Sequence, residues 1–154
     1  MTDKVMFDPG QRLLALEALR RLKASYFYFL DTRQWDRWLA LFTPDATFRW
    51  DRACLDEHDN KTVGFTGVDS IAEHVVHKIM DGASSVHHGH MPMLDLTSET
   101  EAHGIWAMED LVVYADGRSS HGYGHYHERY LKLDGEWRIA SLHLKRLRLE
   151  TARP

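Results

Sequence analysis

The first third of the chain repeats apolar side chains every three or four residues, which is the spacing of one face of an α-helix. Between residues 11 and 31 these positions are Leu19, Leu22, Tyr26, Phe29 and Leu30. The spacing predicts a long helix over residues 11–31. Because such a helix buries its apolar stripe, this side of the helix is expected to pack against the rest of the domain.

Two shorter helices and a strand are expected in the rest of the first half. One helix covers residues 35–42 and ends at Thr43-Pro44-Asp45, because a residue that precedes proline avoids the helical conformation. The sequence ATFRW at residues 46–50 then predicts a strand. The other helix covers residues 69–80, with Gly82 as its stop signal.

After Gly82 the hydrophobic period changes to two residues, which is the period of a β-strand. Four runs cover residues 85–97, 101–114, 122–133 and 136–149, separated by the turn sequences SET, ADG and DG. This pattern predicts an antiparallel meander, and helices followed by strands are typical of an α+β domain. Strands of about 12 residues exceed the usual five or six, so the sheet must curl into a cone-shaped half-barrel with an internal pocket, packed against the three helices.

Length and composition narrow the class of protein. The chain has 154 residues, which fits one domain, and 44% of them are hydrophobic, which is enough for a core. A net charge of −4 argues against nucleic acid or an anionic membrane as partner, because both require a basic surface. Cys54 is the only cysteine, and neither an export signal nor a membrane-spanning stretch is recognisable. We therefore expect a single cytoplasmic domain over residues 1–154.

Two charged residues fall on apolar faces of the predicted strands. Alternation in residues 101–114 places Asp110 on a face with Ala102, Gly104, Trp106, Met108, Val112 and Tyr114. A buried carboxylate must be paired, hydrogen-bonded or protonated, unless the strand frays there and Asp110 reaches water. In the last strand, Arg146 shares a face with Ala140, Leu142 and Leu144. Its guanidinium could hold a substrate oxygen or pair with a carboxylate, or the strand end could open to solvent.

Tyr26 and Asp31 end the apolar face of the first helix. A separation of five residues corresponds to about 140° beyond one full turn, so the two side chains do not stack on each other. They can still border one cavity from adjacent sides. Taken alone, an aspartate at this position is more often a solvent-exposed residue at a helix C-terminus than a catalytic group.

Histidine is unusually frequent, with 11 residues, of which seven lie between positions 87 and 127. Residues two apart share a face of a strand, which gives two pairs: His88 with His90, and His125 with His127. Two such pairs on neighbouring strands could bind a metal in a cupin-like site. The acidic third ligand is missing, however, because Asp95 lies on the opposite face from His90.

His87 points to the other face of the same run, together with Gly89, Met91 and Met93. A single histidine among such neighbours is commonly a core residue whose ring nitrogens are satisfied by hydrogen bonds. A reference pKa near 6.5 also makes a neutral histidine a competent base, so a catalytic role is the alternative.

Four segments together resemble a known family. They are SYFYFLDTRQWDRW, VHHGHMP, SETEAHGIWAMEDLVVYADG and the ending KLDGEWRIASLHLKRL. Over residues 19–149 the chain is similar to the SnoaL-like branch of the NTF2-like superfamily, and most of all to the bile-acid 7α-dehydratases. Scytalone dehydratase is a more distant relative that shares Asp31 and His87, although its second catalytic histidine would fall near Val112. The hexachlorocyclohexane dehydrochlorinases are similar in Asp31 and His87 alone.

The resemblance implies an active site that consists of Tyr26, Asp31, His87, Asp110 and Arg146. In the reaction it implies, neutral His87 takes a proton from carbon while Asp31 fixes and stabilises its ring. Tyr26 donates to the carbonyl oxygen as enolate character grows. Arg146 and Asp110 orient the substrate or assist the leaving hydroxyl. This reaction is the elimination of water, and it requires no metal and no cofactor.

The expected substrate is a hydrophobic, ring-bearing hydroxy-carbonyl compound of steroid-like or polyketide-like type. Its pocket is expected to include Phe29, Trp50, Met91, Trp106, Met108 and Tyr126. Isomerisation or dehydrohalogenation by the same residues, or non-catalytic binding of a hydrophobic ligand, are the alternatives. The resemblance also implies a homo-oligomer, a trimer or a dimer, formed through the outer face of the sheet.

Overall fold

Helix α1, Pro9–Asp31, confirms the long predicted helix and begins two residues earlier. Asp8 caps it, because its side chain accepts a hydrogen bond at 2.9 Å from the backbone N–H of Gln11. Proline suits the first turn, where a backbone donor would have no partner within the helix. The computed structural model describes residues 8–52 and 62–154, so Cys54 lies outside the described residues.

Helix α2, Trp35–Leu39, is shorter than predicted, because strand β1, Phe42–Asp51, begins before the proline. Phe42 pairs with Ile139 of the last strand, and Ile139 donates a backbone hydrogen bond to Leu41. These long-range bonds hold the segment in a strand. The sequence Thr43-Pro44-Asp45 therefore lies within an irregular part of β1.

A third helical segment lies where it was predicted, but most of it is not α-helical. Helix α3, Val68–Ile71, continues into the π-helix η1, Ala72–Ile79. Its buried side chains are Ile71, Val75 and Val76, and Met80 follows them into the core. Strand β2, Thr62–Thr66, was not predicted; it pairs with β1 and precedes α3.

The remaining strands are β3 (Ser84–Gly89), β4 (Met93–Leu96), β5 (Glu101–Val113), β6 (Ser119–Leu133) and β7 (Glu136–Ala152). The run predicted at residues 85–97 is thus divided into β3 and β4. The division falls at residues 90–92, where Pro92 has no N–H to donate to a strand ladder.

The strands form one sheet in the order β2-β1-β7-β6-β5-β3, with β4 also paired to β5. The pairing of β1 with β7 is parallel, and the other pairings are antiparallel. The predicted antiparallel meander is therefore confirmed for β3 to β7, while the parallel pairing of β1 with β7 makes the complete sheet mixed. The sequence showed the hairpins between successive strands. It could not show that β7, about ninety residues later in the chain, pairs with β1.

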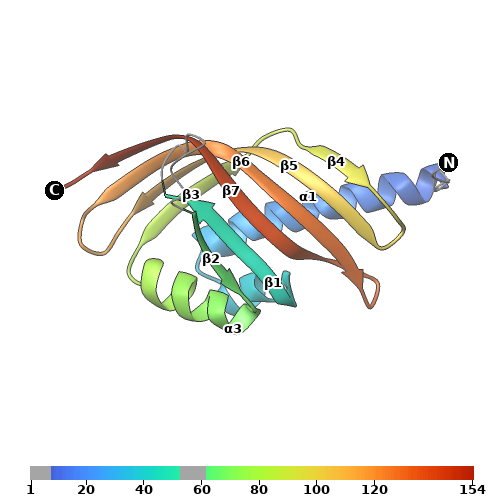
Figure 1. Ribbon diagram of the computed structural model, residues 1–154, viewed down its shortest axis with the longest axis horizontal. Helices are drawn as coiled ribbons and strands as arrows, with labels where there is room; N and C mark the ends of the chain where they lie inside the picture. The colour runs from blue at the N-terminus through green and yellow to red at the C-terminus, as the bar shows by residue number, and fades with distance from the viewer. Residues whose placement is uncertain (1–7, 53–61) are drawn as a thin grey trace.

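Figure 1 shows the long strands β5, β6 and β7 curving across α1, with α3 lying near β1 and β2. This is an α+β arrangement, a mixed curved sheet packed against N-terminal helices. Irregular pairing between β6 and β7 shifts the register beside Arg129 and Tyr130. Ala140 is the extra residue at that point, so Ile139 and Leu142 both face the core. The expected face of β7 was correct from Leu142 to Arg146 and wrong at Ala140.

Candidate active site

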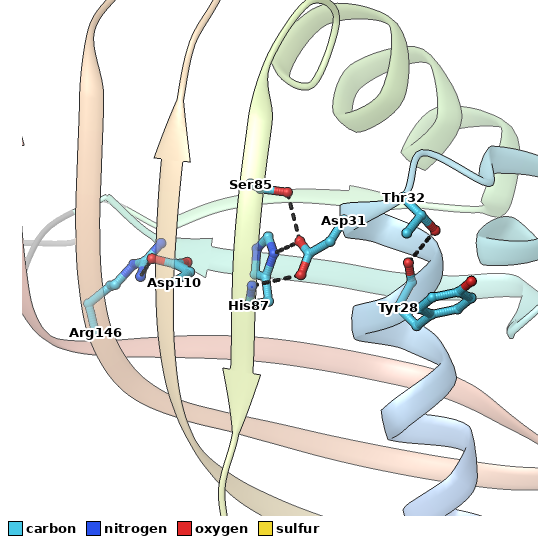
Figure 2. Close-up of polar contacts among 7 residues, drawn as sticks. All are labelled: Tyr28, Asp31, Thr32, Ser85, His87, Asp110 and Arg146. Atoms are coloured by element: carbon cyan, nitrogen blue, oxygen red, sulfur yellow. Dashed lines mark hydrogen bonds and ion pairs between the residues drawn. The ribbon is translucent and has the colours of Figure 1, made fainter.

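Asp31 and His87 form a hydrogen-bonded pair where the C-terminus of α1 meets β3 (Figure 2). Asp31 Oδ1 lies 2.7 Å from His87 Nδ1, and its Oδ2 accepts the backbone N–H of His87 at 2.8 Å. The hydroxyl of Ser85 donates to Oδ1 at 2.8 Å. When Nδ1 carries the proton, His87 Nε2 is the basic ring nitrogen.

The same contacts set the charge of Asp31. Partial burial by itself raises the pKa of this carboxyl group, but the hydrogen bonds from His87 and Ser85 lower the pKa below its usual value. Asp31 is therefore an anion at neutral pH. An anion beside the imidazole stabilises the imidazolium that forms when Nε2 takes a proton.

Asp110 of β5 and Arg146 of β7 form a second pair, although β6 lies between their strands. Arg146 Nη1 donates to Asp110 Oδ1 at 2.8 Å, and both side chains are at most 10% exposed. Gly122 of β6 provides the room, because an added Cβ would lie 1.9 Å from Arg146 Nη1 and 2.6 Å from Asp110 Oδ1. Asp110 is also the direct cross-strand partner of His87.

These contacts arrange the polar groups in one row across the sheet. Burial lowers the pKa of Arg146, but the hydrogen bond and the charge of Asp110 raise it more, so this guanidinium stays charged. In Figure 2 these side chains lie in the order Asp31 on the helix, His87, Asp110 and Arg146. We refer to these four residues as the polar row.

Tyr26 of α1 and Tyr126 of β6 lie close to this row. The two rings are steeply inclined to each other, with an interplanar angle of 69° and centroids 6.0 Å apart. Burial is the main cause that raises the pKa of each phenol well above its usual value. Both side chains therefore remain protonated and able to donate.

A cavity of about 640 Å³ opens over the polar row. Tyr26, His87, Asp110 and Arg146 line it directly, while Asp31 supports His87. Its apolar walls come from Leu30, Trp38, Phe48, Trp50, Val75, Ile79, Met80, Val112, Tyr126, Leu144 and Leu149. Polar lining is added by Asp51, Arg52, Lys78, Arg118, Ser119, Ser120, Thr151 and Arg153. A base and several hydrogen-bond donors thus face an otherwise largely apolar space.

Comparison with known proteins assigns the chain to a family. The family model of the SnoaL-like domain matches residues 11–143. The chain belongs to this family. It is 28% identical over 143 residues to "Probable cyclase FGR4" of Gibberella zeae, which covers 86% of the chain and 91% of that protein.

Solved structures share the SnoaL-like fold. A protein of Novosphingobium aromaticivorans called "Putative Scytalone Dehydratase" has a TM-score of 0.74 and 25% identity, covering 96% of this chain and 97% of the other. A LinA-type3 hexachlorocyclohexane dehydrochlorinase of Novosphingobium barchaimii has a TM-score of 0.76, with 94% of each chain covered. Its identity is 18%, so this likeness concerns the fold alone.

Four residues predicted to line the pocket of this SnoaL-like domain do not line it. Met91 is 94% exposed, because β3 ends at Gly89 and the chain turns outward. Phe29 is buried on the apolar face of α1 but does not reach the cavity, and the guanidinium of Arg37 is 4.1 Å from its ring centroid. Trp106 and Met108 face inward but are buried in core packing, and Trp106 donates to the hydroxyl of Tyr130 at 2.8 Å.

The histidine pairs do not share the geometry that a metal site would need. His88 is exposed, and His90 lies beyond the end of β3, so the two are not neighbours on one strand face. His125 and His127 lie on the face of β6 opposite to the buried Tyr126. Within residues 8–52 and 62–154, no group of three His, Cys, Asp or Glu side chains is placed to hold a metal ion. The same residues include no helix both long and apolar enough to cross a bilayer.

Besides Asp51 of β1, two further buried charged residues of this SnoaL-like domain were not predicted, Lys23 of α1 and Glu128 of β6. Their side chains contact each other beneath Tyr26 and Tyr126. The spacing contained a signal for both. Lys23 falls on the apolar stripe one turn before Tyr26, and Glu128 is in phase with the buried Tyr126 and Tyr130.

Proposed function

We propose that this SnoaL-like protein is a dehydratase, a lyase that eliminates water from a hydrophobic, ring-bearing hydroxy-carbonyl compound of steroid-like or polyketide-like type. The observation that carries the proposal is the 2.7 Å contact between Asp31 and His87 in the wall of a largely apolar cavity. This pair supplies an oriented base, which the reaction needs in order to break a C–H bond beside a carbonyl group.

The polar row supports a stepwise assignment. His87 Nε2 takes the proton from carbon, and the electrons of that C–H bond move towards the carbonyl oxygen to form an enolate. Tyr26 and Tyr126 donate hydrogen bonds to this oxygen as its negative charge grows. The enolate then re-forms a double bond to carbon and expels the neighbouring hydroxyl group, which takes up the proton and leaves as water. The reaction is redox-neutral, so it consumes no oxidant or reductant.

Asp110 and Arg146 are assigned to the leaving group. Arg146 remains charged and lines the cavity, and it is held by Asp110, the cross-strand neighbour of His87. A guanidinium in this position would attract the departing hydroxyl oxygen while His87 returns the proton. Similarity to the Novosphingobium protein called "Putative Scytalone Dehydratase" also favours dehydration over other eliminations.

The test is product analysis with a panel of ring-bearing β-hydroxy ketones and matched β-halo ketones. Mass spectrometry and chiral chromatography distinguish loss of water from loss of halide and from isomerisation. The proposal predicts loss of water by the wild type and a decrease of about 10²- to 10⁴-fold for His87→Gln. His88→Gln is the matched control, because this neighbouring side chain is exposed on the opposite face.

The same panel gives a different result for each alternative function. Halide loss or isomerisation without dehydration would assign the same residues to a different reaction. Binding of the panel with no conversion, unchanged by His87→Gln, would indicate a ligand-binding protein instead of an enzyme.

A further inference from the structure

A lysine and a glutamate are buried together beneath the cavity. Both side chains are 0% exposed, and Lys23 Nζ contacts Glu128 Oε1 directly. Neither residue lines the cavity itself. A buried ion pair contributes little net stability, because the loss of hydration of two charges offsets their attraction. Stability alone therefore gives little reason for these two charges to lie in the core.

Three aromatic rings surround the ammonium group. Lys23 Nζ lies 3.6 Å from the ring centroid of Tyr126, 4.0 Å from that of Tyr26 and 4.8 Å from that of Phe27. The face of an aromatic ring attracts a cation, most strongly where water is excluded. We call Tyr26, Phe27 and Tyr126 the aromatic cage.

Each ring of the cage also contacts the active site. Tyr26 and Tyr126 line the cavity, and their ring centroids are 6.0 Å apart. Phe27 stacks against the ring of His87, with centroids 6.4 Å apart and planes 13° from parallel. Gly89 leaves space for this ring, since an added Cβ would lie 2.4 Å from Phe27 Cε2. The caged ammonium therefore contacts both tyrosine donors and the residue that packs on the base.

The other end of the ion pair is fixed by a chain of hydrogen bonds. Glu128 Oε2 accepts the hydroxyl of Tyr130, and that hydroxyl accepts the indole N–H of Trp106 at 2.8 Å. One carboxylate oxygen is thus taken by Tyr130 and the other by Lys23. The pair is a dipole with its positive end against the cage, in a region where water does not screen it.

We propose that Lys23 is a positioning residue, whose caged ammonium orients Tyr26 and Tyr126 and favours an oxyanion on a ring-bearing ligand bound by these two tyrosines. The inference rests on the proposed function only for the identity of the natural oxyanion, the enolate of the dehydration. A stable aromatic oxyanion tests the same electrostatics without turnover. The ligand class that this arrangement favours is a hydrophobic ring with an anionic oxygen attached to it.

The probe is 4-nitrophenol, because its phenolate absorbs visible light and its neutral form does not. Lys23→Met alone would leave Glu128 unpaired, so the informative variant is Lys23→Met with Glu128→Gln, which removes both charges and keeps similar side-chain lengths. At neutral pH we expect this variant to bind the phenolate about tenfold more weakly than the wild type, equivalent to about one pKa unit of the bound phenol. In a Tyr26→Phe background the same double change should have little effect, because one donor is already absent.

Lys132→Met is the matched control. Its ammonium lies 5.9 Å from the ring centroid of Trp137, and neither residue lines this cavity. The control should bind the phenolate as the wild type does. A purely structural role of Lys23 would lower the melting temperature of the double variant without weakening phenolate binding. That result, or a wild type that binds no phenolate, would overturn the inference.

A measurement on the wild type covers the case in which the double variant does not fold. Burial lowers the pKa of Lys23 to about 8, against the opposing influence of Glu128, and the other titratable groups that face its ammonium are Tyr26 and Tyr126. By linkage, a bound phenolate must raise this pKa by the logarithm of the factor with which the ammonium strengthens phenolate binding, so that a tenfold factor gives about one pKa unit. Nitrogen-15 NMR of Lys23 measures this change, and an unchanged pKa would overturn the inference.

The two proposals fail in different ways. If no substrate is dehydrated but phenolate binding depends on Lys23 and Tyr26 as expected, the dehydratase proposal fails and the role of Lys23 remains. If dehydration occurs but the affinity for phenolate does not depend on Lys23, only the role of Lys23 is refuted.

Discussion

Asp110 and Arg146 are bonded at 2.8 Å although a complete strand lies between the strands that carry them. The contact is possible because Gly122, the cross-strand partner of Asp110, has no side chain to block it. The arginine therefore reaches across β6 into the polar row, beside the direct partner of His87.

Replacing Gly122 with alanine tests this relationship. The new Cβ would fall on Arg146 Nη1 and Asp110 Oδ1, so the pair must separate. Separating a buried pair leaves uncompensated charge, which typically costs about 3 to 5 kcal/mol in the free energy of unfolding. Urea denaturation measures the loss, with His125→Ala on the outward face of β6 as control. A loss below about 1 kcal/mol would mean that the pair moves apart without penalty.

Asp31 and His87 should act as one unit in catalysis. If they do, Asp31→Asn and His87→Gln each lower kcat/KM by a large and similar factor, and the double variant loses little more. Steady-state kinetics on a dehydrated substrate would measure this. Losses that multiply, as for independent residues, would contradict the pairing as the source of activity.

The lowered pKa of Asp31 predicts how stability depends on pH. Its folded pKa lies below the unfolded value of about 3.9, so the carboxylate stabilises the fold above that value, and this contribution is lost as the pH falls towards the folded pKa. Asp31→Asn should therefore be less stable than the wild type at neutral pH and nearly equal to it in strong acid. Thermal denaturation from neutral to acidic pH tests this. A stability difference that stays constant over the range would refute the shift.

Three of the six tyrosines should resist ionisation in the folded protein. Burial is the main cause that raises the pKa of Tyr26, Tyr126 and Tyr130 well above the usual value of about 10. The unfolded chain ionises at the usual value, so these residues make the fold less stable as the pH rises above about 10. Ultraviolet absorbance during an alkaline titration should show a late step that coincides with unfolding. Reversible ionisation of all six tyrosines at the usual pKa would contradict this environment.

We also expect this chain to form a homo-oligomer through the outer face of its sheet. Val86 and Leu111 are direct cross-strand partners on that face, 48% and 42% exposed, and Val113 is 40% exposed on the same strand. Light scattering coupled to size-exclusion chromatography should show a dimer or a trimer. Leu111→Glu should weaken it, whereas Leu147→Glu should not; a monomeric wild type would contradict the expectation.

The apolar pattern predicted most of the elements correctly. The stripe from Leu19 to Leu30 marked the buried face of α1, and alternation in β5 placed Asp110 on the inner face, where it is 3% exposed. These signals are local, because a helix or strand repeats its own geometry every few residues. The pocket was predicted less well, since Trp50 and Tyr126 line it but Phe29, Met91, Trp106 and Met108 do not.

The sequence by itself thus determined most of the helices and strands, and the buried faces of α1 and β5, because that information is periodic along the chain. Only the tertiary structure decided the parallel pairing of β1 with β7, the passage past Gly122 that joins Asp110 to Arg146, and the burial of Lys23 against Glu128. Each of these depends on residues that are far apart in the chain. Their contacts depend on how the sheet curves and where its register shifts, and no local repeat of side chains encodes those features.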